Sequence, residues 1–272
     1  MKTWESYALE GSELDALKRL RPRLGGRCTT LLRHGQYQML QVEAPQVPAE
    51  ERRDAVRWRI KEMVDFPVEQ ASVDLLDIPA SPGAGRPPQV FAVAAAHAVL
   101  APRVHLFQDA KLALAAIDVP ETAQRNVSAL FEDENRGLAL LAFDDDGGRL
   151  TFTFGGELFA TRHVDVTRKD LATPGGEAAG GVFERVLLDV QRSLDNFDRN
   201  YSHVTLSRLL VVPIPGAAAF VEYLKGNLYQ PVELLDLAKG LEFGAIPALA
   251  EPEHQADALL ALGAALREDA AP

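Results

Sequence analysis

The stretch from residue 50 to residue 78 constrains the fold most, because its hydrophobic period changes at a proline. Four apolar residues before that proline recur at the spacing of one helical face: Val56, Ile60, Met63 and Val64. Pro67 cannot continue a helix and biases the residue before it toward extended geometry, so we expect a helix over residues 50–64. The apolar residues that follow predict a short strand over 71–78, which completes a helix–turn–strand unit.

Composition excludes several classes of protein. The 272 residues are 47% hydrophobic and 25% charged, which is ordinary for a soluble globular protein. The formal net charge of -11 argues against a nucleic-acid binder and disfavours direct adhesion to anionic lipid headgroups. Cys28 is the single cysteine, so no internal disulfide and no cysteine zinc site can form, and this favours a reducing compartment such as the cytosol.

The sequence offers no direct membrane attachment. It starts with polar residues where a secretory signal would be apolar, and no stretch approaches the roughly 20 apolar residues that span a bilayer. The longest apolar run, 90–96, predicts a buried strand instead. We therefore expect a cytoplasmic protein that reaches the membrane, if at all, through a partner.

Helix and strand patterns interleave along the chain. Predicted helices cover residues 13–20, 50–64, 99–110, 120–131, 182–201, 217–228 and 257–266. Predicted strands cover residues 28–32, 37–42, 71–78, 89–95, 113–119, 138–143, 150–154, 158–163, 206–212 and 231–237. This order predicts an α/β protein with mixed sheets, and no internal repeat is visible.

Turn residues predict how some strands connect. We expect a hairpin of 28–32 with 37–42 around His34-Gly35, and a second across the Pro- and Gly-rich residues 81–88. Gly155-Gly156 predicts a tight hairpin that completes a three-strand meander after residue 138. The glycine-rich residues 171–181 predict a mobile loop. Hairpins thus open both halves of the chain, as in the actin-like fold.

Four parts of the chain, in order, resemble the PilM group of type IV pilus assembly proteins. They are residues 54–78, residues 90–130, the strand–turn–strand–Gly–strand of 138–164, and the helix and strand of 186–213 together with the final helix at 259–269. The resemblance is closest to the MshI branch, from the mannose-sensitive haemagglutinin (MSHA) pilus system. Together these parts cover most of the chain.

The resemblance implies a two-half actin-like fold (ASKHA, ribonuclease-H-like). The implied division places a first-half core at 1–48 and 111–135, an inserted small subdomain at 49–110, and a second half at 136–272 whose final helix, 256–267, closes back on the core. Met1 lies where the family's first hairpin has already ended, so we expect that hairpin, which forms the first phosphate loop, to be missing.

The resemblance also implies a partner. The family's partner is a bitopic inner-membrane protein of the PilN type, MshJ in the haemagglutinin system, whose short cytoplasmic segment is gripped in a groove of the first half. The assembly ATPase is a further expected partner. Trp58, Ile60, Phe66 and Val73 are the expected contacts, although Trp58 suits either the core or an exposed anchor.

Nucleotide binding is the open question. In the family a second phosphate loop follows an Asp-x-Gly pattern, matched here by Asp144, Asp146, Gly147 and Gly148, with Asp144 where a metal-linked carboxylate is expected. Three consecutive carboxylates repel a triphosphate unless Mg²⁺ is held, so an acidic hairpin turn is the simpler interpretation. The adenine loop is replaced by residues 212–217, where two prolines leave only Gly216 for close approach.

The sequence therefore favours a pseudo-ATPase scaffold without a catalytic residue, a metal or a cofactor, with ATP and Mg²⁺ kept as an open possibility. One alternative is a nucleotide-binding switch or kinase of the same fold. Another is a GspL-type cytoplasmic domain of a type II secretion platform. That kind of chain continues into a membrane span, which this sequence does not contain.

Overall fold

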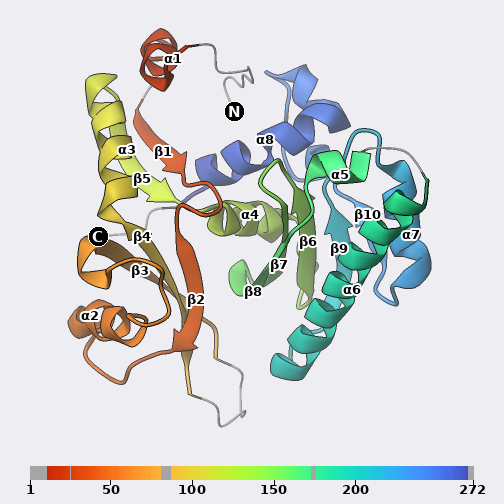
Figure 1. The fold of residues 1–272 in the computed structure, drawn as a ribbon. Coiled ribbons are helices and arrows are strands. Elements are labelled where there is room, and N and C mark those ends of the chain that lie inside the picture. The colour runs from red at the N-terminus through yellow and green to blue at the C-terminus, as the bar shows by residue number, and fades with distance from the viewer. Residues whose placement is uncertain (1–10, 25, 81–86, 173–175, 269–272) are drawn as a thin grey trace. The chain divides into compact units, whose positions relative to one another are not determined.

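The computed structural model describes residues 11–24, 26–80, 87–172 and 176–268, without the side chains of 176–180 and 253. It divides into two compact units, the first ending at Val119 and the second beginning at Pro120. Helices and strands interleave through both units (Figure 1).

The first unit contains the helices α1 (Glu13–Leu20), α2 (Ala49–Arg59) and α3 (His97–Asp109), and the strands β1 (Arg27–Leu31), β2 (Gln38–Glu43), β3 (Ala71–Ile78), β4 (Gln89–Ala96) and β5 (Ala113–Asp118). The second unit contains α4 (Pro120–Ser128), α5 (Arg168–Ala172), α6 (Gly176–Asn200), α7 (Ala218–Asn227) and α8 (Pro252–Ala265), and the strands β6 (Gly137–Phe143), β7 (Gly148–Phe154), β8 (Glu157–Val164), β9 (Leu206–Val211) and β10 (Val232–Leu234). Short 3₁₀ turns cover Val68–Gln70, Ala129–Phe131, Leu237–Lys239 and Pro247–Ala250.

In the first unit, β2, β4 and β3 form an antiparallel sheet in that order. α2 covers one face, where Val56 and Ile60 are fully buried against β4 and against Val73 of β3. β1 and β5 form a separate two-stranded parallel sheet, and α1 and α3 pack on each other beside it. The predicted hairpin of residues 71–78 with 89–95 is confirmed as β3 and β4, although residues 81–86 of its turn lie outside the described ranges.

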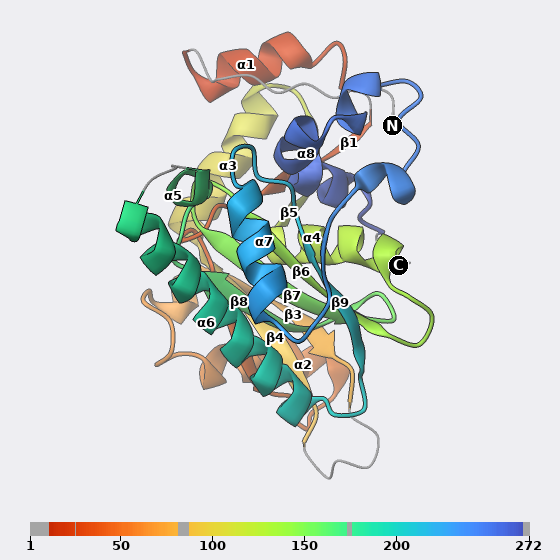
Figure 2. The same ribbon diagram turned by 90° about the vertical axis from the view of Figure 1, so that its right-hand side faces the viewer.

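In the second unit, a five-stranded sheet has the order β10–β9–β6–β7–β8. β6, β7 and β8 form the predicted meander, and β9 and β10 run parallel to β6. α4 and α8 cover one face of the sheet, and α6 and α7 cover the other (Figures 1 and 2). On the second face Phe152 of β7 stacks on Phe197 of α6, with ring centroids 4.7 Å apart. The sheet thus lies between two helical layers, which is a stable arrangement for a sheet that is apolar on both faces.

The predicted pairing of residues 28–32 with 37–42 was wrong. Both strands exist, as β1 and β2, but they belong to different sheets. β1 pairs in parallel with β5, and the N–H of Leu32 extends that pairing by donating to the carbonyl oxygen of Asp118 at 2.9 Å. The chain leaves β1 only after this bond and then enters the other sheet, so the turn around Gly35 joins two sheets and closes no hairpin.

The predicted helix over 50–64 ends early, at Arg59. The main-chain N–H of Asp65 donates to the side chain of Gln38 on β2 at 3.1 Å, and the Gln38 amide donates back to the Asp65 carboxylate at 2.6 Å. These contacts return the chain to the sheet before another helical turn forms, and tertiary contacts of this kind override helix propensity. Met63, expected on the buried face, is therefore 48% exposed.

Three further predicted boundaries shift. Within the predicted loop 171–181, α5 covers the first residues and α6 begins at Gly176, because a long anchored helix can propagate through glycine at a cost of only about 1 kcal/mol each. Residues 173–175 lie outside the described ranges. Of the strand predicted over 231–237, only β10 (Val232–Leu234) forms. Asp236 then caps a 3₁₀ turn. α8 begins earlier than predicted, with a proline at its first position.

The two units differ from the division that the resemblance implied. α4 lies within 111–135, expected in the first-half core, but it packs on β6, β7 and α8 in the second unit. β2 lies outside the expected subdomain 49–110, yet it pairs with β4 inside it. The inserted subdomain stays a prediction, with β2 as part of its sheet.

The crossing of α4 and α8 gives a test of the packing. A Cβ atom on Gly263 of α8 would overlap the carbonyl oxygen of Ala123 on α4, and Ala123 is fully buried. We expect Gly263→Ala to lower the free energy of unfolding in urea by about 1–3 kcal/mol, because backbone cannot move aside easily.

Gly181→Ala is the matched control, since Gly181 lies inside α6 with nothing within 4 Å of the added Cβ. It should raise the free energy of unfolding by about 0.5–1 kcal/mol, because alanine is the better helix former. The same sign of change in both variants would contradict the close approach of α4 and α8.

Candidate functional site

Of the four predicted partner contacts, two lie in the core. Ile60 is 0% exposed and Val73 is 3% exposed, both in the cluster beneath α2, so neither is available to touch a partner. Phe66 is half-buried against the same cluster. Trp58 is 62% exposed at the end of α2, and Lys61 Nζ lies 5.0 Å from the centre of its ring. Trp58 and Phe66 therefore remain as candidate contacts.

Exposed ion pairs lie between α2 and β3 and next to them. Arg52 forms an ion pair with Asp77, and Arg53 forms one with Asp74 at 2.9 Å. Lys61 Nζ lies 2.7 Å from Glu69 Oε1, and this hydrogen bond lowers the pKa of Glu69. Because the pKa is lowered in the folded state, the stabilisation by this pair is present at neutral pH and is lost as the pH falls through the lowered pKa.

A groove of about 320 Å³ lies along the free edge of β5. Its walls are α3, through Val104 and Gln108, and β5 itself from Leu114 to Ile117. Among the described residues β5 pairs only with β1, so the N–H and C=O groups on its other edge have no strand beside them. The β1–β5 register skips Ala115, which marks a bulge in β5 where it pairs with β1. An apolar groove beside an open strand edge is suited to an extended peptide.

Sequence reasoning missed this groove. The strand pattern of residues 113–119 was evident, but a free edge depends on which strands pair, and that was predicted wrongly for β1. No signal within β5 itself distinguishes an open edge from a covered one.

The acidic hairpin Asp144–Gly148 is closed by its own contacts. Asp144 Oδ1 accepts the main-chain N–H of Asp146 at 2.9 Å, and Asp144 Oδ2 accepts from Arg149 Nη2 at 3.1 Å. Arg149 is 6% exposed, and its Nε lies 3.9 Å from Glu121 of α4. Both oxygens of the Asp144 carboxylate are thus engaged within the protein, one of them by a buried guanidinium.

The two glycines of the hairpin are required by packing. Gly147 has φ +134°, and a Cβ there would lie 2.5 Å from the ring of His163 on β8. A Cβ on Gly148 would lie 2.5 Å from the ring of Phe143. Both glycines are buried, and side chains of the same sheet fill the space on the side where a Cβ would lie. As they lie in the structure, these residues do not fit a Mg²⁺–phosphate group.

Gly216 lies in a loop at the carboxyl end of β9, where open α/β sheets bind their ligands. It is exposed, has φ +79°, and its nearest neighbour for a Cβ is the carbonyl oxygen of Ala172 at 3.6 Å. Beside this loop a cavity of about 410 Å³ is lined by Pro213, Ile214, Pro215, Glu251, Pro252 and His254.

This cavity offers little to a phosphate. Three of its six lining residues are prolines without an N–H donor, and Glu251 adds a negative charge. Nearby, Arg168 donates to Asp257 at 2.5 Å, and this bond raises the pKa of the guanidinium and occupies it. Gly216 thus meets the steric requirement for nucleotide approach, but the groups around it supply few donors.

Two features are absent from the residues that the structure describes. These residues contain no group of three or more His, Cys, Asp or Glu side chains placed to share a metal ion. No helix among them is both long and apolar enough to cross a bilayer.

No protein-family model matches the sequence, and no curated protein matches it. Among solved structures, a chain of the PilM–PilN type IV pilus biogenesis complex superimposes with a TM-score of 0.70 at 18% sequence identity, covering 94% of this chain and 85% of that one. This chain has an actin-like fold.

Two other solved structures are more distant. The cytoplasmic domain of EpsL, an inner-membrane component of the Vibrio cholerae type II secretion system, gives a TM-score of 0.49 at 13% identity, covering 94% and 82% of the two chains. A Bacteroides thetaiotaomicron protein with an actin-like ATPase fold gives 0.47 at 11% identity, covering 92% and 81%. Both scores are too low to add to the comparison.

The closure of the acidic hairpin is testable through Arg149. Arg149→Met should lower the free energy of unfolding by about 2–4 kcal/mol, because it leaves the carboxylates of Asp144 and Glu121 without their buried cation. Urea unfolding measures the change.

Arg162→Met is the control, because Arg162 is 61% exposed and lies 3.9 Å from Asp189. Its effect should stay within about 0.5 kcal/mol. Equal small effects in both variants would mean that Arg149 does not hold the hairpin.

Proposed function

We propose that this protein is a scaffold of a type IV pilus assembly platform that binds the short cytoplasmic segment of a PilN-like bitopic inner-membrane protein. The observation that carries the proposal is the fold shared along 94% of the chain with a chain of the PilM–PilN complex. The four sequence segments that resemble the PilM group support it independently. On this proposal the protein is cytoplasmic and reaches the inner membrane through its partner.

We also propose which type of pilus the protein serves and which partner it binds. The MshI-like features favour the MSHA type of pilus, with an MshJ-like protein as the PilN-like partner and the assembly ATPase as a further contact. The alternative is a GspL-type role in a type II secretion platform. The same fold would serve that role, but the partner would be the secretion ATPase.

The groove beside β5 is where we place the partner segment. An extended segment can pair with the open edge of β5 through its main chain, while alternate apolar side chains enter the space between β5 and α3. The main-chain bonds supply affinity, and residues such as Val104 and Leu114 select apolar side chains. Trp58, exposed on α2, offers an additional anchor.

We further propose that the scaffold works without hydrolysing ATP. Three features support this: the engaged carboxylate of Asp144, the burial of Gly147 and Gly148, and the prolines around Gly216. A nucleotide-binding switch or kinase would need these groups to rearrange on binding.

A calorimetric titration of the full chain with the N-terminal cytoplasmic peptide of the PilN-like protein tests the function. We expect one-to-one binding with a dissociation constant of about 10–50 µM or tighter. Val104→Glu should weaken binding by about tenfold or more, because it places a charge in the apolar groove.

Leu188→Glu is the control, since Leu188 is 43% exposed on a helix outside the groove. It should leave the affinity unchanged. Absence of binding by the unmodified chain would overturn the proposed function. Binding that is lost in Trp58→Ala but kept in Val104→Glu would move the segment from the β5 groove to the surface of α2.

A further inference from the structure

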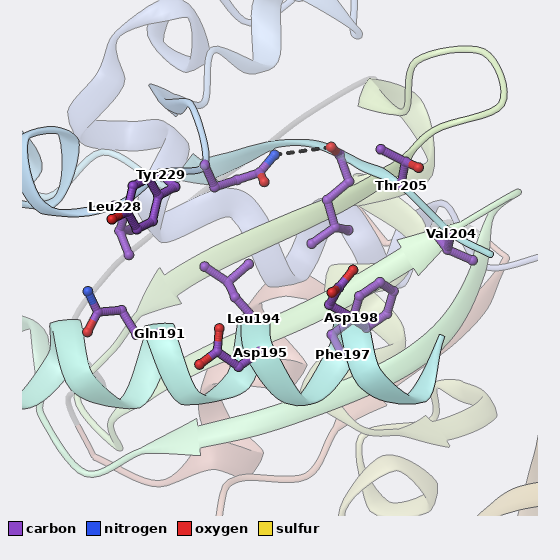
Figure 3. Close-up of a pocket in the computed structure, with 11 residues that line it drawn as sticks. Gln191, Leu194, Asp195, Phe197, Asp198, Val204, Thr205, Leu228 and Tyr229 are labelled. Atoms are coloured by element: carbon purple, nitrogen blue, oxygen red, sulfur yellow. Dashed lines mark hydrogen bonds between the residues drawn. The ribbon is translucent and has the colours of Figure 1, made fainter. Parts of the chain in front are cut away.

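A second groove lies in the second unit, between α6 and the start of β9 (Figure 3). Its volume is about 290 Å³. One wall comes from α6 between Gln191 and Asp198, and the other from residues 204–206 and 228–230. β10 pairs with β9 only from Leu209 onward, so the first part of β9 has no strand on that side among the described residues. A bulge against β6 occurs in the same part of β9.

The floor of this groove is apolar and rigid. It is formed by Leu194, Phe197, Val204 and Leu206. Phe197 is 1% exposed and stacks on Phe152, while Val204 is 3% exposed, so the floor belongs to the core of the unit. A floor of this kind can take the aliphatic part of a long side chain without rearrangement.

The rim of the groove carries unpaired acceptors. Asp195 and Asp198 are exposed on α6, and Figure 3 shows both carboxylates on the side of the helix that faces β9. Within the described ranges neither carboxylate forms an ion pair, and Arg199 donates to the main-chain oxygen of Asp195. A ligand that enters this groove therefore meets two carboxylates that no cation of the described chain neutralises.

Two amide side chains also lie at the rim. The NH₂ group of Gln191 donates to the carbonyl of Asn227, and that of Gln230 donates to the carbonyl of Leu206, each at 3.1 Å. One N–H of each amide is thus engaged within the protein, and each amide oxygen can accept a hydrogen bond from a ligand. Tyr229 is fully exposed at the same rim, and an aromatic face attracts a cation.

The chemistry of the groove indicates which kind of ligand fits. Its volume of about 290 Å³ accommodates one or two long side chains. Lysine and arginine combine an aliphatic stem, which suits the apolar floor, with a donor-only head, which suits the carboxylates. An anionic ligand would be repelled by Asp195 and Asp198.

We propose that this groove binds a lysine- or arginine-bearing segment of a partner protein. The segment lies extended beside the start of β9, with its cationic heads on Asp195 and Asp198 and a stem over Leu194. The site is separate from the β5 groove and does not depend on the proposed pilus function, because it follows from the groove and its charges alone.

Fluorescence polarisation with short labelled probes tests the proposal on the full chain. The probes are acetyl-Leu-Arg-Val-Arg-Leu-amide and the same sequence with Glu or Gln in place of Arg. We expect the Arg probe to bind at least about tenfold more tightly than either of the others, and its affinity to fall as salt is raised. Equal affinities for the three probes, or no binding of the Arg probe, would overturn the proposal.

A matched pair of double variants separates the groove from the overall negative charge. Asp195→Asn with Asp198→Asn should weaken binding of the Arg probe by about tenfold or more. Glu184→Gln with Glu242→Gln removes the same charge at two exposed positions outside the groove and should leave the affinity within about twofold. Equal weakening by both pairs would show general electrostatic attraction only and would overturn the proposal.

A variant with reversed charge tests whether weaker binding of the Arg probe comes from loss of folding. Asp195→Lys with Asp198→Lys should bind the Glu probe more tightly than the Arg probe. Binding of the Arg probe that survives this exchange would place its site elsewhere.

Discussion

Strand β6 is buried along its whole length, and the arrangement of the second unit depends on this burial. A strand that is apolar on both faces needs a helical layer on each side. α4 and α8 supply one layer, and α6 and α7 supply the other. The acidic hairpin follows directly at the end of β6, so its position is fixed by the most buried element of the unit. The same layering produces the groove of Figure 3. α6 packs on the sheet, and β10 pairs with β9 only from Leu209 onward, so a space remains beside the start of β9.

The groups that resemble a nucleotide site are satisfied by the protein itself. Arg149 reaches Asp144 from the neighbouring strand, and Gln124 of α4, fully buried, donates to the carbonyl of Leu140 at 2.8 Å. Buried polar networks of this kind are costly to break, since each partner removed leaves another unpaired. By contrast, polar groups are open to a partner at the free edge of β5 and at Asp195 and Asp198. This contrast is the physical basis for proposing a scaffold that holds other proteins.

Much of the fold could be predicted from local patterns. The meander of β6, β7 and β8 followed from Gly155-Gly156, and the long helix α6 followed from its three- and four-residue spacing. The strand that pairs with β1 could not be predicted, because β5 lies far along the chain and neither strand has a sequence pattern that specifies its partner. The early end of α2 depends on Gln38 of β2, a contact invisible in the helical pattern.

Site residues were harder to predict than elements. Ile60 and Val73 were predicted to contact a partner, but both are buried in the core, while Trp58 is exposed. The β5 groove is lined by residues 104–117, but its open edge depends on which strands pair. The groove of Figure 3 combines three separate segments, residues 191–198, 204–206 and 228–230, so no single motif signals it. Asp144 matched a family pattern, yet its role depends on Arg149, whose burial shows only in three dimensions.

We propose that this actin-like fold binds proteins and not nucleotides. A calorimetric titration of the full chain with ATP and Mg²⁺, up to about 1 mM, tests it most directly. The account predicts no saturable heat, because Asp144 and its glycines are already engaged. A one-site isotherm that disappears in Asp144→Asn would contradict the account.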